Sequence, residues 1–427
     1  MHYNRSKFTP VMSAVLALTT TSLVSAQTQS DLHRDAATRN VGNDDFMMKY
    51  ARAFYCNLPD NNNGIVVAAR ATNSIRVPLT QIFDNVWFVG TRYVGQYMIK
   101  TDKGIVQVDA GNNAAEMQNY NLPALQSLGL SPSYPLKAVF LTHGHGDHDG
   151  GAMYLRDNLN PEFFLGSGDN SLSSPKPYSP TPIDSSDLSM RQLSIGGMPF
   201  TVLPTPGHTP GSTSAVLTVR DGGKERKVLI NGGQSMTSSI PQVAQYLGSI
   251  ERTYAMAKAT KVDGVMTPHV YWDGTAAKLD DINANGRTNP SQFIFGHETV
   301  MRQLAVAREC SAAWLTKLDS TQVLPVWRVN SIAFVGGNPT PTKVAATVQN
   351  GWGPLANQKV TFSVAETGAT CTATTNAQGI ASCQINPLRP HQDKVTASFT
   401  GAKSADFVDL PAETTALVCS NGNCNAK

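Results

Sequence analysis

A short segment, residues 141–151, carries an unusual density of metal-binding side chains. It reads Leu-Thr-His-Gly-His-Gly-Asp-His-Asp-Gly-Gly and follows an apolar run of strand character, residues 136–141. Histidine and carboxylate together suit Zn²⁺, and the interleaved glycines let the backbone turn sharply enough for alternate side chains to converge. A polar turn is the alternative interpretation, but the whole chain has nine histidines, so three of them gathered here by chance is improbable. The segment therefore predicts a metal site where a strand ends.

The length and the N-terminal composition are typical of an exported protein with several domains. The 427 residues are enough for two or three domains. Residues 1–26 carry Arg5 and Lys7, then an apolar stretch, then Val24-Ser25-Ala26, and this order is typical of a signal peptide. The apolar stretch is too short to span a membrane. Removal of the signal peptide lowers the formal net charge from +3 to +1, which gives no electrostatic reason to bind nucleic acid. We therefore expect a secreted or periplasmic protein with no membrane span and no nucleic-acid partner.

The six cysteines predict disulfide bonds in such a compartment. Six cysteines allow fifteen complete pairings, so only their spacing can choose among these. Residues 374–379 are typical of a hairpin turn, and the two cysteines that flank it are expected to face each other across two strands. The expected pairs are Cys371 with Cys383, Cys419 with Cys424 and, by elimination, Cys56 with Cys310.

Residues 27–320 alternate between strand and helix patterns. An N-terminal segment, residues 27–76, has helical spacing from Phe46 to Leu58, and the Pro- and Ser-rich residues 171–187 are expected to form a surface loop beside the active site. Strands are predicted at 86–89, 97–100, 105–109, 136–141, 200–203, 214–219 and 228–230, and helices at 112–128, 241–257 and 300–318.

The composition changes after Pro325 to Thr, Val, Ala and Asn, with turn residues about every ten positions. This pattern predicts a small all-β sandwich over residues 325–412, followed by a tail, residues 413–427. Its strands are expected at 343–349, 358–364, 370–374, 380–385 and 394–400. Residues 353–362 and 374–381 resemble bacterial Ig-like domains of invasin type, which implies a contact with a cell surface or a carbohydrate.

The pattern His-x-His-x-Asp-His-x-Gly-Gly of residues 143–151 resembles the signature of the metallo-β-lactamase superfamily. The similarity extends over about residues 82–318 and includes Asn289-Pro290. It implies an α/β fold, an αββα sandwich, over residues 77–320.

The same resemblance implies two zinc ions per chain. It assigns His143, His145 and His208 to the first ion and Asp147, His148 and His269 to the second, as in the β-lactamase subclass with an Asp-His-His second site. His208 lies in a Thr-Pro-Gly-His-Thr-Pro-Gly-Ser loop between two strands, and His269 follows another strand. Asp109 resembles the carboxylate that orients a ligating histidine in this superfamily. Among the remaining histidines, His297 is expected to be structural, and His33 and His391 to be solvated.

One departure from the superfamily bears on the substrate. Thioesterases and lactonases of this superfamily carry a bridging aspartate after the strand 228–230, whereas this chain has Asn-Gly-Gly-Gln-Ser-Met at 231–236. The absence disfavours glyoxalase-like and lactonase-like functions and agrees with β-lactamases, in which Ser235 would help to hold the substrate carboxylate. Tyr271 and Trp272 are bulkier than the residues expected after a ligating histidine, and they are expected to shape the substrate pocket.

The resemblance therefore predicts a zinc-dependent hydrolase of a small-molecule substrate. Two zinc ions can activate a shared water, and Asp147 is expected to be catalytic by orienting it. The expected substrate is a cyclic amide, namely a β-lactam, which implies antibiotic resistance. The alternative is a lactonase or ester hydrolase of the same fold. An adhesion protein that keeps the fold only as a scaffold is disfavoured because all six ligands are present.

Overall fold

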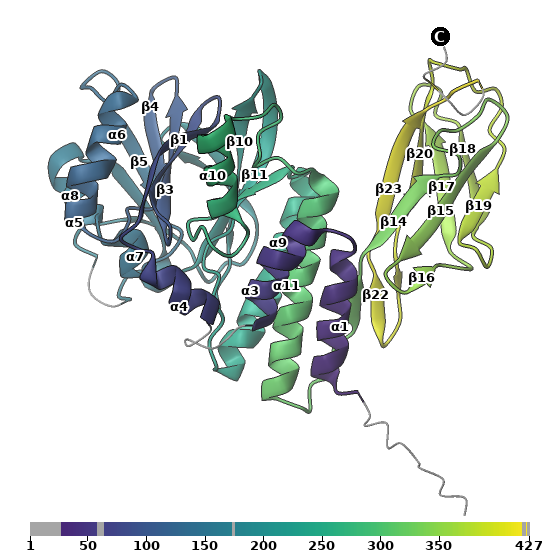
Figure 1. Cartoon of the computed structure of the whole chain (residues 1–427), viewed down its shortest axis with the longest axis horizontal. Helices are drawn as coiled ribbons and strands as arrows, with labels where there is room; N and C mark the ends of the chain where they lie inside the picture. Colours follow the sequence, from purple (N-terminus) through teal and green to yellow (C-terminus); the bar gives the residue numbers. More distant parts are fainter. Residues whose placement is uncertain (1–26, 58–63, 173–175, 421–423, 425–427) are drawn as a thin grey trace, which may run out of the picture.

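The structure is a computed structural model that describes residues 27–57, 64–172, 176–420 and 424. The predicted signal peptide, residues 1–26, lies outside the described residues. Figure 1 shows a large α/β part and an all-β C-terminal part, with a layer of long helices between them. Among the described residues, no helix combines the length and the apolar character that a membrane span requires.

The first sheet has seven strands in sequence order, antiparallel up to β4 and parallel from there on. Its outer face is covered by α5, a π-helical turn at Met117–Asn121, α6 and α8 (Figure 1). The strands are β1 (Arg76–Phe83), β2 (Val86–Thr91), β3 (Gly95–Thr101), β4 (Gly104–Val108), β5 (Leu136–Phe140), β6 (Glu162–Gly166) and β7 (Thr181–Ile183), and the helices are α5 (Ala114–Glu116), α6 (Leu122–Ser127) and α8 (Ala152–Leu159).

The second sheet has the strand order β12-β11-β10-β9-β8. Buried apolar side chains such as Phe88 and Phe140 from the first sheet and Phe200 from the second fill the space between the sheets. The elements are β8 (Arg191–Ile195), β9 (Met198–Pro204), β10 (Thr213–Asp221), β11 (Lys224–Ile230) and β12 (Gly264–Met266), with the helices α9 (Ile240–Thr260), α10 (Thr275–Asn285) and α11 (His297–Leu318). Helices α9 and α11 cover the outer face, so the predicted αββα sandwich is confirmed.

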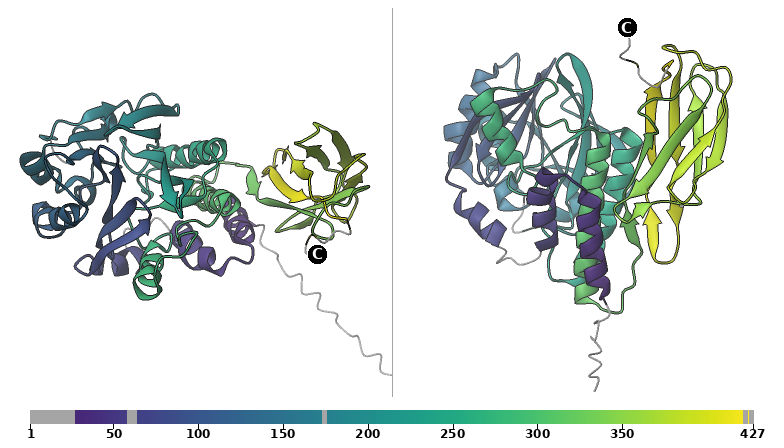
Figure 2. Two further views of the ribbon diagram at one scale, coloured as in Figure 1. Left: turned by 90° about the horizontal axis from the view of Figure 1, so that it is seen from above. Right: turned by 45° about the vertical axis from the view of Figure 1, so that its right-hand side comes forward.

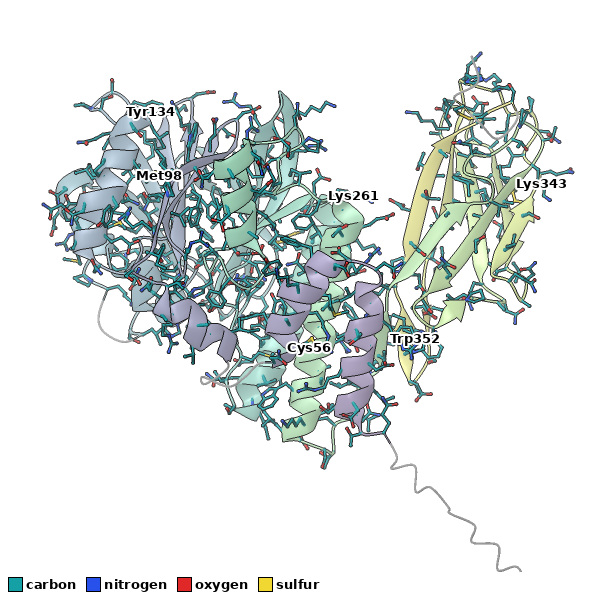
Figure 3. All side chains as sticks on the ribbon, in the orientation of Figure 1. Cys56, Met98, Tyr134, Lys261, Lys343 and Trp352 are labelled. Atoms are coloured by element: carbon teal, nitrogen blue, oxygen red, sulfur yellow. A yellow bond between two sulfur atoms is a disulfide. The ribbon has the colours of Figure 1, made fainter. Side chains whose placement is uncertain are left out.

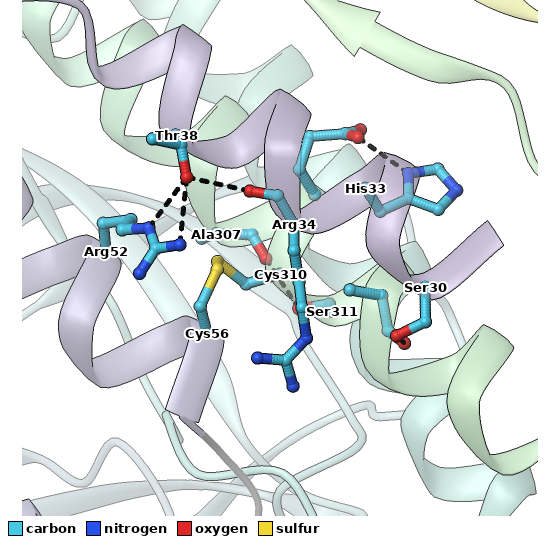
Figure 4. Close-up of a disulfide and its surroundings, with 11 residues drawn as sticks. Ser30, His33, Arg34, Thr38, Arg52, Cys56, Ala307, Cys310 and Ser311 are labelled. Atoms are coloured by element: carbon cyan, nitrogen blue, oxygen red, sulfur yellow. Dashed lines mark hydrogen bonds and ion pairs between the residues drawn. A yellow bond between two sulfur atoms is a disulfide. The ribbon is translucent and has the colours of Figure 1, made fainter. Parts of the chain in front are cut away.

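The N-terminal segment adds helices to the outer layer beside α9 and α11 (Figure 1). They are α1 (Gln29–Val41), α2 (Asp45–Met47), a π-helical turn at Met48–Arg52 and α3 (Ala53–Asn57). Helix α4 (Gly64–Ala71) lies apart from α9 and α11, below the first sheet in this view. The Cys56–Cys310 disulfide joins α3 to α11, as the elimination predicted (Figure 4).

The prediction that His33 is solvated is wrong. Its side chain is fully buried between α1 and α11, and its Nδ1 lies 2.7 Å from Oε2 of Glu309. The polar composition of α1 conceals this contact, because the helix buries His33 and Asn40 beside Ala36, Ala37 and Val41. His391 is exposed as expected, and His297 is partly buried, with Nδ1 2.9 Å from the carbonyl of Val262.

The C-terminal part is all-β, as predicted, and its two four-stranded sheets enclose a separate apolar core. The strands are β13 (Val326–Arg328), β14 (Asn330–Phe334), β15 (Val344–Asn350), β16 (Gly353–Pro354), β17 (Lys359–Val364), β18 (Thr370–Thr374), β19 (Ile380–Cys383), β20 (Lys394–Phe399), β21 (Ala402–Lys403), β22 (Phe407–Asp409) and β23 (Ala412–Leu417). The predicted tail is wrong in its first residues, because β23 pairs with β20 along its whole length.

The other two disulfides also join the expected cysteines, but the hairpin explanation for Cys371–Cys383 is wrong. The turn at residues 376–379 is present. However, β18 pairs with β17 in one sheet, whereas β19 pairs with β15 in the other. The turn therefore carries the chain from one sheet to the other, and the disulfide links the two sheets of the sandwich.

The α/β part and the sandwich meet along α1, α9 and α11 (Figure 2). Trp327 is the main contact: its ring packs against Tyr254, and its backbone N–H donates to Oε1 of Glu309 at 3.0 Å. Asn40 of α1 donates to the carbonyl of Trp327 and accepts from the N–H of Val329. In Figure 3, Lys261 and Trp352 mark the two ends of this boundary.

Candidate functional site

The histidines of the motif at residues 143–151 lie in the loop and short helix that follow strand β5. His143 follows β5 and is buried, and His145 precedes the short helix α7 (Gly146–Asp149), which carries Asp147 and His148. His208 lies in the loop between β9 and β10, and His269 follows β12. Because these loops lie at one end of the two sheets, the four residues of the motif meet the distant His208 and His269 there.

The nitrogen atoms of the first three histidines approach one another as ligands of one ion would. Nε2 of His208 lies 3.1 Å from Nδ1 of His145 and 3.1 Å from Nε2 of His143. A tetrahedral Zn²⁺ with Zn–N bonds of about 2.0–2.1 Å places its ligand nitrogens about 3.3 Å apart. The spacing of His143, His145 and His208 therefore fits a zinc ion.

The other three residues form a second group beside the first. Nε2 of His148 lies 3.2 Å from Nε2 of His269, and the carboxylate oxygens of Asp147 lie 3.8 Å and 3.6 Å from these two nitrogens. The imidazole rings of His143 and His148 are 4.0 Å apart between centroids, so the two groups are adjacent. His143, Asp147 and His148 also lie close enough together to hold an ion. The structure thus brings all six expected ligands together.

The hydrogen-bond partners of the Nδ1 atoms decide which ring nitrogen of three of these histidines carries the proton. Nδ1 of His148 lies 2.7 Å from the carboxylate of Asp109, that of His208 lies 2.9 Å from the carbonyl of Ser235, and that of His269 lies 3.2 Å from the carbonyl of Tyr93. These oxygen atoms accept hydrogen bonds, so each Nδ1 is the donor and each Nε2 faces the other candidate ligands. Two ring nitrogens 3.2 Å apart, as in His148 and His269, need a proton or a metal ion between them. The donor set therefore fits zinc.

Burial keeps most of these imidazoles neutral. It lowers the pKa of His208 to about 3 and that of His269 to about 4, and it holds the pKa of His143 well below its usual value. Burial opposes ionisation of Asp147 too, but the nearby His148 and His269 outweigh it and lower the pKa of Asp147 to about 2. Neutral imidazoles beside an ionised carboxylate are the protonation states that zinc requires of its ligands.

The carboxylate of Asp109 holds the ligand loop in place through hydrogen bonds. It follows β4 with a positive φ of 60°, a conformation that aspartate tolerates better than most residues. Its carboxylate accepts hydrogen bonds from the backbone N–H and the hydroxyl of Thr142 at 2.7 and 3.0 Å, in addition to the ring of His148. Burial disfavours the protonated form of His148, but the charges of Asp109 and Asp147 outweigh it and raise its pKa.

Close packing explains why the motif ends in two glycines. A Cβ atom at Gly150 would collide with the carbonyls of Asn112 and Gly146, and one at Gly151 with Met117 and the carbonyl of Ala110. The ligand loop therefore packs directly against the backbone that follows β4.

A buried carboxylate that the sequence did not predict, that of Asp169, joins two ligand loops. Its side chain is fully buried; Oδ2 accepts from the N–H of Gly144 and the hydroxyl of Thr209, and Oδ1 from the N–H of Gly211. Gly144 separates His143 from His145, and Thr209 follows His208. One carboxylate thus fixes both loops of the first metal group. A lone aspartate after a strand is too common to be recognised from the sequence.

The predicted loop at residues 171–187 contacts the same region through two of its described residues. Nζ of Lys176 donates to the carboxylate of Asp149 at 2.6 Å and to the carbonyl of Gly144 at 2.9 Å. The hydroxyl of Tyr178 donates to the same carboxylate. The expectation that the loop borders the ligand segment is therefore met, although residues 173–175 lie outside the described chain and Thr181–Ile183 forms β7.

A cavity of about 520 Å³ opens over the ligands. Its polar wall includes His145, Asp147, His208, His269 and Ser235, and its apolar wall includes Phe54, Val66, Met236 and Tyr271. The ring of Tyr271 stacks on Tyr93 and meets the ring of Phe54 edge-on. Trp272 borders the cavity but is 1% exposed and packs against Tyr55, so it supports the wall from behind.

The αββα sandwich carries a cluster of histidines and aspartates at one end of its sheets, and two groups of these residues could hold a metal ion. Residues 89–223 match the family model described as Metallo-beta-lactamase superfamily, the superfamily whose signature residues 143–151 resemble.

Individual proteins are similar to parts of the chain. The uncharacterised protein YobT of Bacillus subtilis is 32% identical over 147 residues, which are 30% of this chain and 58% of YobT, so the chain spans a little over half of that relative. A subclass B3 metallo-β-lactamase of Bradyrhizobium japonicum is 24% identical and covers 59% of this chain and 95% of its own, with a TM-score of 0.42. The metallo-β-lactamase of Legionella gormanii is 20% identical and covers 58% and 97%, with a TM-score of 0.44.

Proposed function

We propose that this protein is an exported di-zinc hydrolase that opens the amide ring of a β-lactam. The observation that supports it is the convergence of six ligand atoms in two adjacent groups, with three contacts of 3.1–3.2 Å between ring nitrogens. Three disulfides in the described structure favour a secreted or periplasmic location, because such bonds persist in oxidising compartments.

The residues of the chain have separate roles in this proposal. His143, His145 and His208 would hold one zinc ion and Asp147, His148 and His269 the other; when bound, these ions supply Lewis acidity and a water that ionises near neutral pH. Asp147 accepts a hydrogen bond from the attacking water and so orients it toward the carbonyl carbon. Asp109 holds His148 in the tautomer whose Nε2 faces the metal position.

Ser235 can take part in substrate binding without losing its contact to His208. Both its backbone carbonyl and its hydroxyl lie 2.9 Å from Nδ1 of His208. Because the carbonyl alone satisfies that N–H, the hydroxyl is available to donate to a substrate carboxylate. Ser235→Ala should therefore raise the KM of β-lactams by up to about tenfold, the effect of losing one hydrogen bond.

The alternative function, hydrolysis of a lactone or a simple ester, uses the same ligands. The ring of Tyr271 favours this alternative function, because it lies beside His269 in the wall of the cavity and leaves less room there. Contact of the C-terminal sandwich with a carbohydrate or a cell surface, and its Ig-like identity, stay predictions.

A substrate panel tests the proposal. Protein purified without chelator should contain close to two zinc ions per chain, and it should hydrolyse penicillins, cephalosporins or carbapenems faster than acyl-homoserine lactones and aryl esters. A chelator should abolish turnover, and added zinc should restore it. If esters or lactones turn over orders of magnitude faster than every β-lactam, the substrate assignment fails; if no zinc binds, the metal site fails as well.

A further inference from the structure

The N-terminal helices reach the active-site cavity and contribute part of its wall. Phe54 of α3 and Val66 and Arg70 of α4 line it together with the metal-site residues. The sequence predicts only helical spacing for this segment, so its presence at the cavity is a separate structural observation.

This wall is held in place from several sides. The Cys56–Cys310 disulfide fixes α3 to α11, and Phe54 and Val66 belong to the apolar core of the helical layer (Figure 4). Beyond α4, Asn73 accepts a hydrogen bond from the hydroxyl of Thr91 at 2.8 Å and donates to Asn112 at 3.1 Å. The backbone and the apolar side chains of this wall are therefore in place before a substrate binds, while the side chain of Arg70 is exposed to solvent.

Arg70 is the one permanently charged cation among the described residues that line the cavity. The nearby phenol of Tyr93 raises the pKa of Arg70, and the ring of Tyr93 meets the ring of His269 edge-on with centroids 4.8 Å apart. The carbonyl of Tyr93 is in turn the acceptor for His269. Arg70 thus lies on the side of the cavity formed by the second metal group, and within the described chain no carboxylate comes within ion-pair distance of it, in contrast to Arg92, which pairs with Asp280.

We propose that Arg70 binds the carboxylate of the substrate and makes the enzyme selective for anionic substrates with an apolar substituent. This inference rests on the proposed hydrolysis of a β-lactam. In a penicillin the carboxylate is attached to the carbon next to the ring nitrogen, so a guanidinium beside the second metal group would hold the leaving nitrogen on that side. The apolar wall of Phe54, Val66 and Met236 then receives the rest of the molecule. Arginine suits the role because its planar fork binds a carboxylate through two parallel hydrogen bonds.

A pair of substrates that differ only in this charge tests the assignment. Benzylpenicillin and its methyl ester should be assayed with the zinc-loaded wild type, Arg70→Gln, Arg70→Lys and the control Lys49→Gln, which removes one positive charge from an exposed site on the same N-terminal segment. Arg70→Gln should raise the KM of benzylpenicillin about ten- to a hundredfold and leave that of the ester within about twofold. Arg70→Lys should recover part of the loss, and Lys49→Gln should match the wild type. If Arg70→Gln changes acid and ester alike, or changes neither, the role of Arg70 is wrong.

A binding measurement separates this proposal from the hydrolytic one. Calorimetry with phenylacetate and the neutral phenylacetamide, on zinc-loaded proteins of equal zinc content and equal circular dichroism, needs no turnover. The wild type should prefer phenylacetate, and Arg70→Gln should lose most of that preference. If no β-lactam is hydrolysed but this preference depends on Arg70, the proposed reaction fails and the anion site stands. If Arg70→Gln keeps the full preference, the anion site is overturned whatever the reaction.

Discussion

The carboxylate of Asp169 accepts a hydrogen bond at 2.8 Å from the backbone N–H of Gly144, the residue between His143 and His145. The same oxygen accepts the hydroxyl of Thr209 at 2.7 Å, next to His208. The three ligands of the first metal group therefore share one buried anchor that binds no metal itself.

Replacement of Asp169 by asparagine should weaken both the fold and the metal site. An amide would turn an NH₂ group toward N–H or O–H donors on one side, and hydrogen bonds to a charged group contribute about 1.5–3 kcal/mol each. We expect the free energy of unfolding to fall by roughly 2–4 kcal/mol and zinc affinity to fall by about tenfold or more. Urea unfolding and zinc titration measure the two effects. The exposed Asp184, which also accepts a backbone N–H, is the matched control, and Asp184→Asn should change neither. Equal behaviour of the two variants would contradict the anchoring role.

The candidate metal ligands could be predicted from the sequence because four of the six lie within six residues, His143 to His148. His208 and His269 were recognisable only through the family pattern, since nothing local distinguishes a ligating histidine from a structural one. Asp169 and Arg70 could not be predicted, because their importance comes from loops and helices that meet only in the folded chain. The aromatic residues after His269 were assigned correctly to the cavity, but the depth of Trp272 depends on α3, which packs against it from the N-terminal segment.

Long-range pairing limited the fold prediction in the same way. The turn at residues 376–379 was visible, but whether its two arms pair with each other depends on β15 and β17, which are distant in the sequence. Likewise, His33 lies in a polar stretch, and only the presence of Glu309 on α11 makes its burial favourable.

Replacement of Asp147 by alanine should affect the second metal position selectively. The variant removes one ligand and the group expected to orient the water, while His143, His145 and His208 keep their mutual spacing. We expect zinc content to fall from about two ions toward one and kcat to fall by at least a thousandfold on every substrate. Metal analysis and steady-state kinetics on the same sample provide the measurement. A variant with two tightly bound ions and normal turnover would remove Asp147 from the mechanism.

Removal of the C-terminal sandwich should spare hydrolysis only if the cut leaves Trp327 in place. Residues 322–329 belong in part to the helical layer, where Trp327 satisfies Glu309 and Asn40 binds the following backbone. A chain that ends after Val329 should therefore keep most of its turnover. One that ends after Thr321 should unfold several degrees lower, because buried Glu309 loses a donor, at a cost of about 1–3 kcal/mol. Thermal unfolding and turnover at 25 °C test both forms. If both are folded and inactive, the sandwich takes part in catalysis.

The metal-free protein should lose stability as the pH falls below neutrality. Burial, with the neighbouring His145, His148 and His269, lowers the pKa of His208 from 6.5 to about 3, and burial with His148 lowers that of His269 to about 4. The unfolded chain therefore takes up protons below about pH 6.5 that the native state refuses, and stability declines until the pH reaches the depressed native values. The raised pKa of His148 has the opposite effect on the pH dependence of stability, but several imidazoles with lowered pKa values outweigh this one group. Urea unfolding of the chelated protein at intervals from pH 7.5 to 4.5 should show a continuous fall in the free energy of unfolding, and His208→Gln should reduce its slope. His391→Gln, at an exposed position, is the control and should leave the slope unchanged; a slope that is flat in the wild type would show that the imidazoles are not held neutral by burial.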